Sequence, residues 1–239
     1  MIITQGVSKY FGNLCALNNV SFHINKGEIV GFLGQNGAGK TTLMRVLTGY
    51  LPASSGKVTI GGNELAHNSL AVRRRIGYLP EVPPLYPQMS VKEYLTFAAR
   101  LKDVPSGQIK LQVEKVLSEC HLKQVRDITI ANLSLGYKQR VGIAQAIIND
   151  PDVLILDEPT KGLDPIQILH VRNLIRDLRE KRTVLLSTHI LSEIEQMAHR
   201  VLMINKGEII ADDTLDNLLH THAGTLEEVF LKLNQPAES

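Results

Sequence analysis

Cysteine is scarce in this chain, and its two copies are poorly placed to act together. Cys15 and Cys120 lie far apart in the sequence, and they form neither a C-x-x-C motif nor the spacing of a metal site. The cysteines therefore argue against a disulfide framework and against a cysteine metal site. Two unpaired cysteines suit a reducing compartment.

Long apolar runs are also missing. Every apolar run is far shorter than the roughly 20 residues that a bilayer-spanning helix needs. The first residues lack the basic segment and the apolar stretch of a signal peptide. We therefore expect a soluble, cytoplasmic protein with no direct membrane insertion, so that any membrane role depends on a separate partner chain.

A strong charge of either sign is absent as well. The chain has 26 Lys and Arg against 24 Asp and Glu, a formal net charge of +2 at pH 7. The basic run at residues 73–75 is more typical of a solvated helix face than of a nucleic-acid or lipid site. Charge thus gives no case for a nucleic-acid partner. The length of 239 residues and the hydrophobic content of 44% fit one large globular domain, or a core with a helical insertion.

The most informative feature that is present is a phosphate-binding loop. Residues 34–41 match the pattern G-x-x-x-x-G-K-[ST]. Its glycines let backbone N–H groups crowd around phosphate oxygens without Cβ clashes. The Lys40 ammonium can reach the β- and γ-phosphates, and the Thr41 hydroxyl can ligate Mg²⁺. The loop therefore predicts ATP and Mg²⁺ as cofactors, held by Gly34, Asn36, Gly37, Ala38, Gly39, Lys40, Thr41 and Thr42.

The flanks of this loop are those that the motif requires. Residues 28–33 predict a short apolar strand, and residues 42–47 have apolar side chains at helical spacing. The helix N-terminus is then aimed at the bound anion. A glycine-rich turn that binds nothing would not need these flanks.

Two acidic residues follow a second apolar strand. Residues 153–156 are apolar at every position, which predicts a parallel strand buried on both faces. Asp157 can then hold Mg²⁺ across from Thr41. Because strand side chains alternate, Glu158 points elsewhere and is suited to act as general base for the attacking water. The alternative is a pair of solvated acids. His189, after the next apolar strand, can hydrogen-bond the γ-phosphate or the water, although a lone histidine there is usually structural.

Alternating strands and helices predict a doubly wound α/β core with the nucleotide at the carboxyl ends of its strands. Turn residues predict hairpins at 25–27 and at 205–207. A proline-rich loop then leads to a helical stretch at residues 85–148, beginning at a capping box on Ser90, that interrupts the core. A short amphipathic helix is expected at 225–233.

Residues 3–233 resemble the nucleotide-binding subunit of an ABC transporter. Beyond the loop and the acidic pair, residues 133–137 resemble the family signature L-S-G-G-Q, and residues 159–164 resemble the D-loop region. His189 matches the switch histidine. The resemblance implies a phosphate-loop (RecA-like) α/β core with a mostly parallel sheet, an N-terminal antiparallel β subdomain and an inserted α-helical signature subdomain.

This resemblance also implies how the chain divides. We expect a single ABC ATPase domain over residues 1–239. Its expected parts are an ATP-binding core with the N-terminal β subdomain (1–84 and 149–215), a helical subdomain (85–148) and a C-terminal helical tail (216–239).

Further site residues follow from the resemblance. Phe11 matches the aromatic residue that stacks on adenine, with Tyr10 as a neighbouring alternative. Ser134 and Gly136 would clamp the γ-phosphate of ATP held by a second subunit, and Asp164 would contact nucleotide from the D-loop. Two chains would then sandwich two ATP molecules head to tail, closing on binding and opening after hydrolysis. The alternative for Ser134 is an ordinary helix cap.

Three positions depart from the family pattern. Leu135 replaces the first signature glycine, and Tyr137 replaces the usual glutamine. Glu81 stands where the family has a glutamine that senses Mg²⁺ and the γ-phosphate. A glutamate keeps a ligand oxygen for Mg²⁺ but adds negative charge and loses a donor. The proline-rich run at 81–87 resembles the branch that serves ABC-2 type exporters.

The expected function is ATP hydrolysis that powers a separate transmembrane permease, with export favoured over import. Glu158 would be the base, Lys40 would stabilise the phosphates, and His189 would position the γ-phosphate and water. The chain would pair as a homodimer or with a paralogue and sit on the cytoplasmic face of the inner (plasma) membrane through the permease. Importer ATPases often carry an added C-terminal domain, for which the tail from Asp212 is too short.

Two other classes stay open. One is a soluble ABC ATPase that acts on nucleic acid or ribosomes, which usually has two cassettes or a coiled-coil insertion. The other is a nucleotide-binding regulator without turnover, for which Glu81 is the one hint. The sequence does not name a transported substrate.

Overall fold

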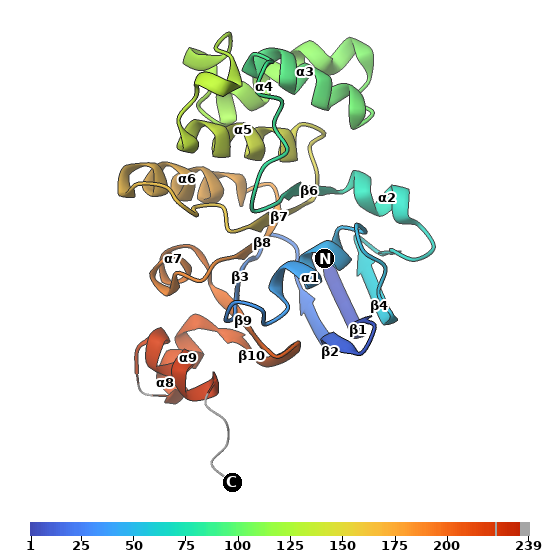
Figure 1. Ribbon diagram of the computed structural model, residues 1–239, viewed down its shortest axis with the longest axis vertical. Helices are drawn as coiled ribbons and strands as arrows, with labels where there is room; N and C mark the ends of the chain where they lie inside the picture. The colour runs from blue at the N-terminus through green and yellow to red at the C-terminus, as the bar shows by residue number, and fades with distance from the viewer. Residues whose placement is uncertain (223, 235–239) are drawn as a thin grey trace.

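A six-stranded sheet forms the centre of the structure (Figure 1). The computed structural model describes residues 1–222 and 224–234. The strand order is β10-β9-β3-β8-β7-β6, and all neighbours pair in parallel except β10, which is antiparallel to β9. The strands are β3 (Ile29–Leu33), β6 (Ile76–Leu79), β7 (Val153–Asp157), β8 (Thr183–Ser187), β9 (Arg200–Asn205) and β10 (Glu208–Thr214).

A second, antiparallel sheet is built from the N-terminal part of the chain, with the order β2-β1-β4-β5. In its register Ile2 lies opposite Ile24 on one side and Ile60 on the other. Its strands are β1 (Ile2–Phe11), β2 (Leu14–Ile24), β4 (Ser55–Ile60) and β5 (Asn63–Glu64). The expected antiparallel N-terminal sheet beside a mostly parallel one is therefore confirmed.

One predicted hairpin is wrong. Residues 25–27 form a turn, but the chain does not fold back on β2 to make a hairpin. It crosses into the other sheet, where β3 pairs in parallel with β8 and β9. A glycine turn signals only a change of direction, and the partner of the next strand is set by long-range packing. The second predicted hairpin, through residues 205–207, is confirmed between β9 and β10.

Helices pack against the large sheet and also form both ends of the molecule. Figure 1 shows α3, α4 and α5 at one end of the molecule and α8 and α9 at the other. The helices are α1 (Lys40–Leu47), α2 (Ser69–Arg74), α3 (Val91–Leu101), α4 (Ile109–Glu119), α5 (Leu135–Ile147), α6 (Pro165–Leu178), α7 (Leu191–Met197), α8 (Leu215–His222) and α9 (Leu226–Asn234). No helix within the described ranges is both long enough and apolar enough to cross a membrane.

The helical stretch between β6 and β7 starts as the sequence predicts. The Ser90 hydroxyl accepts a hydrogen bond from the Glu93 N–H, and the Glu93 carboxylate accepts one from the Ser90 N–H, which completes the capping box at the start of α3. The division of the chain into a core, a helical subdomain and a tail at 84, 148 and 215 stays a prediction.

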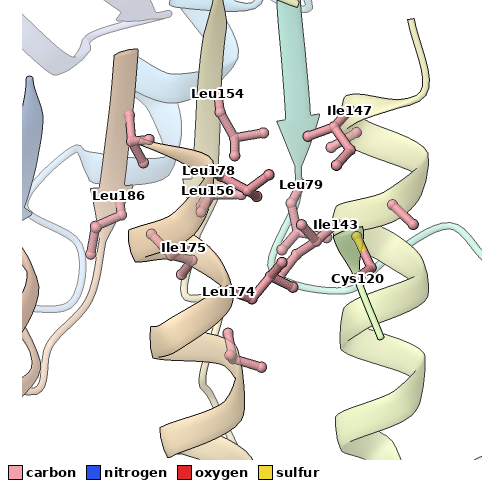
Figure 2. Packing of buried hydrophobic residues seen from close by; sticks show 14 of the residues in the cluster. Leu79, Cys120, Ile143, Ile147, Leu154, Leu156, Leu174, Ile175, Leu178 and Leu186 are labelled. Carbon is pink, nitrogen blue, oxygen red and sulfur yellow. The ribbon is translucent and has the colours of Figure 1, made fainter. Parts of the chain in front are cut away.

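Side chains of the large sheet alternate between two hydrophobic cores. In β3, Ile29 and Leu33 enter the core beneath α5 and α6, while Val30 and Phe32 enter the core beneath α1. Figure 2 shows the first core, where strand and helix side chains interdigitate. Its labelled residues are Leu79, Cys120, Ile143, Ile147, Leu154, Leu156, Leu174, Ile175, Leu178 and Leu186. Burial on both faces explains why the five residues of β7 have no exposed member.

Candidate functional site

A cavity of about 730 Å³ lies beside the carboxyl ends of β3, β7 and β8. Parallel strands end at the same edge of a sheet, so residues far apart in sequence meet there. Most of the predicted site residues line this cavity. They are Phe11, Asn36, Gly37, Gly39, Lys40, Thr41, Thr42, Glu81, Asp157, Glu158 and His189.

The loop between β3 and α1 has a backbone that requires glycine. Gly39 has a φ of 111°, and a Cβ added there would lie 2.8 Å from the carbonyl oxygen of Ala16. Any other residue would be strained and would push β2 away. Gly34 and Ala38 are buried beneath the loop and are not among the residues that line the cavity.

Lys40 is held inside the loop. Its ammonium donates to the carbonyl oxygens of Gly34 at 2.6 Å and Gln35 at 3.1 Å, and the residue is 8% exposed. Burial lowers the pKa of Lys40, and the nearby carboxylates of Glu158 and Asp157 oppose this shift. The ammonium of Lys40 therefore lies within the phosphate loop and lines the cavity where a phosphate chain would bind.

Asp157 ends β7 with one oxygen satisfied and one free. Its Oδ1 accepts a hydrogen bond of 2.6 Å from the Ser187 hydroxyl. Its Oδ2 is buried and has no hydrogen-bond partner among the described residues. An unpaired buried carboxylate oxygen is costly unless a cation or water occupies its free position. Asp157 and Thr41 therefore fit a divalent cation.

Glu158 and His189 are brought together at the next position. Glu158 has a φ of 51°, a left-handed conformation that is uncommon for a residue with a side chain. Its N–H donates to the Ser187 hydroxyl at 3.1 Å, which helps to hold the backbone there. Its Oε2 lies 2.8 Å from Nδ1 of His189. The two residues that the sequence assigns to water activation are therefore hydrogen-bonded to each other.

Glu81 forms an ion pair that the sequence did not predict. Its carboxylate contacts the ammonium of Lys161, and both side chains line the cavity and are partly exposed. This hydrogen bond and the negative charge of Glu81 raise the pKa of Lys161. Lys161 lies in the D-loop region, but sequence reasoning gave it no role.

Three further predicted residues, besides Gly34 and Ala38, do not line the cavity of their own chain. Ser134 caps α5, where its hydroxyl accepts from the Tyr137 N–H at 3.4 Å, and Asp164 caps α6. Gly136 packs so closely on α6 that an added Cβ would lie 2.2 Å from the Gln167 side-chain oxygen. Their assignment to a second subunit's ATP stays a prediction.

Other residues line the cavity without having been predicted. Gln35 lies inside the phosphate-loop motif, so its place at the cavity could have been predicted from the sequence. Cys15 lies in a strand and Lys206 in a turn, and no sequence motif marks either of them as a site residue. The remaining unpredicted residues are Leu14, Ala16, Lys161 and Gly207.

A phosphate loop between a buried parallel strand and a helix, faced by a carboxylate pair at the end of another parallel strand, defines a phosphate-loop nucleotide triphosphatase. The family described as "ABC transporter" matches residues 17–161. The chain belongs to this family, as an ATP-binding cassette with ATPase activity. The resemblance seen in the sequence is thereby confirmed.

Individual comparisons agree with this assignment. The bacitracin transport ATP-binding protein BcrA of Bacillus licheniformis is 38% identical over 229 residues, which cover 95% of this chain and 74% of that one. The Nod factor export ATP-binding protein I of Bradyrhizobium diazoefficiens is 36% identical over 224 residues, covering 92% and 72%. A solved dimeric bacterial ABC transporter cassette is 26% identical, with a TM-score of 0.80 and coverage of 90% and 99%. These relatives lend no support to the nucleic-acid alternative.

Proposed function

We propose that this chain hydrolyses ATP with Mg²⁺ to drive a separate transmembrane permease, and that the transport is export. The observation that carries the proposal is the joint arrangement of a phosphate loop, a half-satisfied Asp157 and a hydrogen-bonded Glu158–His189 pair around one cavity. A regulator that binds ATP without hydrolysing it would not need the hydrogen-bonded Glu158–His189 pair.

Mg²⁺ would be held by the Thr41 hydroxyl and by Asp157, through its free Oδ2 or an intervening water, with Glu81 at the same cavity as a further oxygen donor. The cation would supply neutralisation of charge on the phosphate oxygens. Ser187 holds the carboxylate of Asp157 in place by donating to its other oxygen.

The chain's own residues supply the remaining chemistry. Lys40 places a positive charge where the β- and γ-phosphates would lie. Glu158 takes the proton of the attacking water, and His189 orients the Glu158 carboxylate through the 2.8 Å contact. Phe11 lines the same cavity from β1, about half exposed, and offers its ring to the base.

A second subunit completes the site in this proposal. Ser134 and Gly136 begin α5, away from the cavity of their own chain, and the helix N-terminus there suits an anion held by another molecule. Two copies related by a two-fold axis would exchange these contacts.

Export is supported by the relatives. One is described as an export ATP-binding protein and another serves bacitracin transport. We propose that the chain likewise works at the cytoplasmic face of a membrane, bound to its permease.

The test is a membrane pull-down with the Glu158→Gln protein in ATP and Mg²⁺. This variant should bind ATP but hydrolyse it at least a hundredfold more slowly than wild type, and so hold the closed complex. Mass spectrometry should then identify a multi-span membrane protein, and loss of the chain should abolish outward transport by it. Lys40→Ala, which should not bind ATP, is the matched control. Recovery of ribosomal or other soluble proteins alone would contradict the transport role.

A further inference from the structure

We propose that Lys161 is a positioning residue of the nucleotide site, which acts by neutralising Glu81 so that the phosphates of ATP meet no uncompensated carboxylate there. The inference rests on the proposed function, since it concerns ATP bound in this cavity. It concerns two residues that both belong to this chain and that nothing in the motif pattern connects.

The fold brings the two side chains together from separate loops. Glu81 follows β6, and Lys161 lies in the turn after β7. These strands pair in parallel, with Leu79 opposite Leu156, so the two loops leave the same edge of the sheet. The Lys161 ammonium reaches the Glu81 carboxylate across this gap.

The turn that carries Lys161 is attached to the proposed general base. The Lys161 N–H donates to the carbonyl oxygen of Glu158 at 3.2 Å. Glu81 begins the proline-rich loop that leads to α3. The ion pair therefore links the turn behind Glu158 to the loop that connects the core to the helices.

The charges that line the cavity are balanced, with three lysines and three acids, and five of the six have a defined partner. The six are Lys40, Lys161, Lys206, Glu81, Asp157 and Glu158. Lys40 is engaged by loop carbonyls, Asp157 by Ser187 and Glu158 by His189. Lys161 is the partner of Glu81.

Removal of Lys161 would therefore change binding more than folding. Both members of the pair are partly exposed, with 54% and 41% of the side chains accessible, and exposed ion pairs contribute little to stability. An uncompensated Glu81 would instead repel the negatively charged phosphate chain in the same cavity. If Lys161 instead bound phosphate directly, its removal would also weaken ATP binding. That decrease in affinity would then be the same whether or not Glu81 is present.

The experiment is a suppressor test on the dissociation constant of a fluorescent ATP analogue, measured on the whole chain in EDTA so that turnover and metal are excluded. Lys161→Met should weaken binding by about three- to tenfold, which corresponds to roughly 1 kcal/mol of repulsion from one uncompensated charge in the same solvent-accessible cavity. Adding Glu81→Gln should restore the constant to within about twofold of Glu81→Gln alone. The charge-swapped Glu81→Lys/Lys161→Glu protein, which keeps the pair, should also bind within about twofold of wild type.

Lys206 provides the matched control, because it lines the same cavity and is not the lysine paired with Glu81. Lys206→Met should weaken binding to the same extent with and without Glu81→Gln. The Lys161→Met defect should shrink as salt is raised, whereas a folding defect would not. Thermal melting of each variant verifies that it is folded.

Two results would overturn the inference while leaving the proposed function in place. One is unchanged binding by Lys161→Met. The other is a Lys161→Met defect that Glu81→Gln fails to relieve, which would make Lys161 a direct phosphate contact. A wild-type chain that binds no ATP analogue would instead sink the proposed function, and the inference with it.

Discussion

Ser187 shows how one hydroxyl can organise two functional acids. It donates to Asp157 Oδ1 at 2.6 Å and accepts from the Glu158 N–H at 3.1 Å. The hydroxyl thus fixes the orientation of the carboxylate that would meet Mg²⁺ and of the backbone that carries the base. Groups that hydrogen-bond to a metal-binding side chain tune the affinity of the site for the metal. The effect of Ser187 should therefore appear in the Mg²⁺ dependence of the ATPase rate.

We expect Ser187→Ala to raise the Mg²⁺ concentration for half-maximal ATP hydrolysis by about tenfold or more. The measurement is a Mg²⁺ titration of the ATPase rate at saturating ATP. Ser118→Ala, at an exposed position of α4, should leave the titration unchanged. An unaltered Mg²⁺ midpoint in Ser187→Ala would rule out the orienting role.

The sequence predicts the parts of the site that are contiguous and misses those that are not. The phosphate loop is encoded in eight consecutive residues, so its chemistry and spacing can be recognised locally. Asp157 and Glu158 are recognisable because they end an apolar run. The pairing of Glu81 with Lys161 depends instead on the register of β6 on β7, which no local pattern specifies.

At the level of helices and strands, α5 and α6 approach closely where the signature begins. A Cβ at Gly136 would lie 2.2 Å from Gln167 Oε1, so a side chain there would require Gln167 to turn away. The absence of a side chain at Gly136 therefore allows α5 to pack closely against Gln167 of α6. This role in packing is independent of any contact between Gly136 and a partner's nucleotide.

Gly136→Ala should lower the free energy of unfolding by about 1 kcal/mol or less, because the flexible Gln167 side chain can turn away from the added methyl group. Urea denaturation measures this, and adding Gln167→Ala should recover most of the loss. Gly107→Ala is the matched control, since an added Cβ there meets nothing within 4 Å. An equal loss in the double variant would show that the clash is not with Gln167.

The end of α5 is tied to the end of α3 by one lysine. Lys102 donates to the carbonyl oxygens of Gln145 at 2.9 Å and Ala146 at 3.0 Å, and to the Asn149 side chain at 3.3 Å. Burial lowers the pKa of Lys102 to about 8. The carbonyls at a helix C-terminus favour this ammonium, but burial outweighs them.

Stability should therefore depend on pH through Lys102. A folded-state pKa near 8, below the ordinary value of 10.5, means that the unfolded chain binds more protons between these values. The free energy of unfolding should then rise with pH from about 8 to 10.5, by an amount of order 2 kcal/mol. Lys102→Met should lose this rise, and Lys110→Met, exposed on α4, should keep it. Chemical denaturation at several pH values gives the comparison, and parallel slopes in wild type and Lys102→Met would exclude the effect.

Strand and helix types follow from local pattern more readily than their partners do. The apolar run that became β7 could be predicted as a buried parallel strand because both of its faces are apolar. The turn at residues 25–27 has the same local residues whether the next strand pairs with β2 or with β8, so the hairpin prediction failed. Apart from its first residue, helix α8 lies within the C-terminal helical tail expected over residues 216–239, although no local capping signal marked where it begins.

For the whole molecule, one sheet serves two hydrophobic cores. Leu154 and Ile155 are consecutive in β7 and fully buried, yet they belong to opposite cores. Since the same hydrogen-bonded strands bound both cores, loss of either core should unfold the other.

Leu154→Ala and Ile155→Ala should each lower the free energy of unfolding by about 2–5 kcal/mol. Each variant should still unfold in a single transition, detected together by circular dichroism and by calorimetry. Leu111→Ala, at a side chain that is 73% exposed, should change stability little. A second transition in either core variant would show that the two cores fold independently.

The topology of the large sheet has a consequence for biosynthesis. Strand β3, which leads into the phosphate loop, pairs with β8 and β9, whose residues lie 155 and 170 positions further along the chain (Ile29 opposite Val184, Val30 opposite Arg200). At roughly 5–20 residues per second, the ribosome needs about 8–30 s to deliver those partners. The antiparallel sheet, by contrast, is complete by Glu64 and can pair early. During translation the nascent chain therefore carries its nucleotide loop on a strand without neighbours, and ATP can meet a formed site only after β8 and β9 have been synthesised.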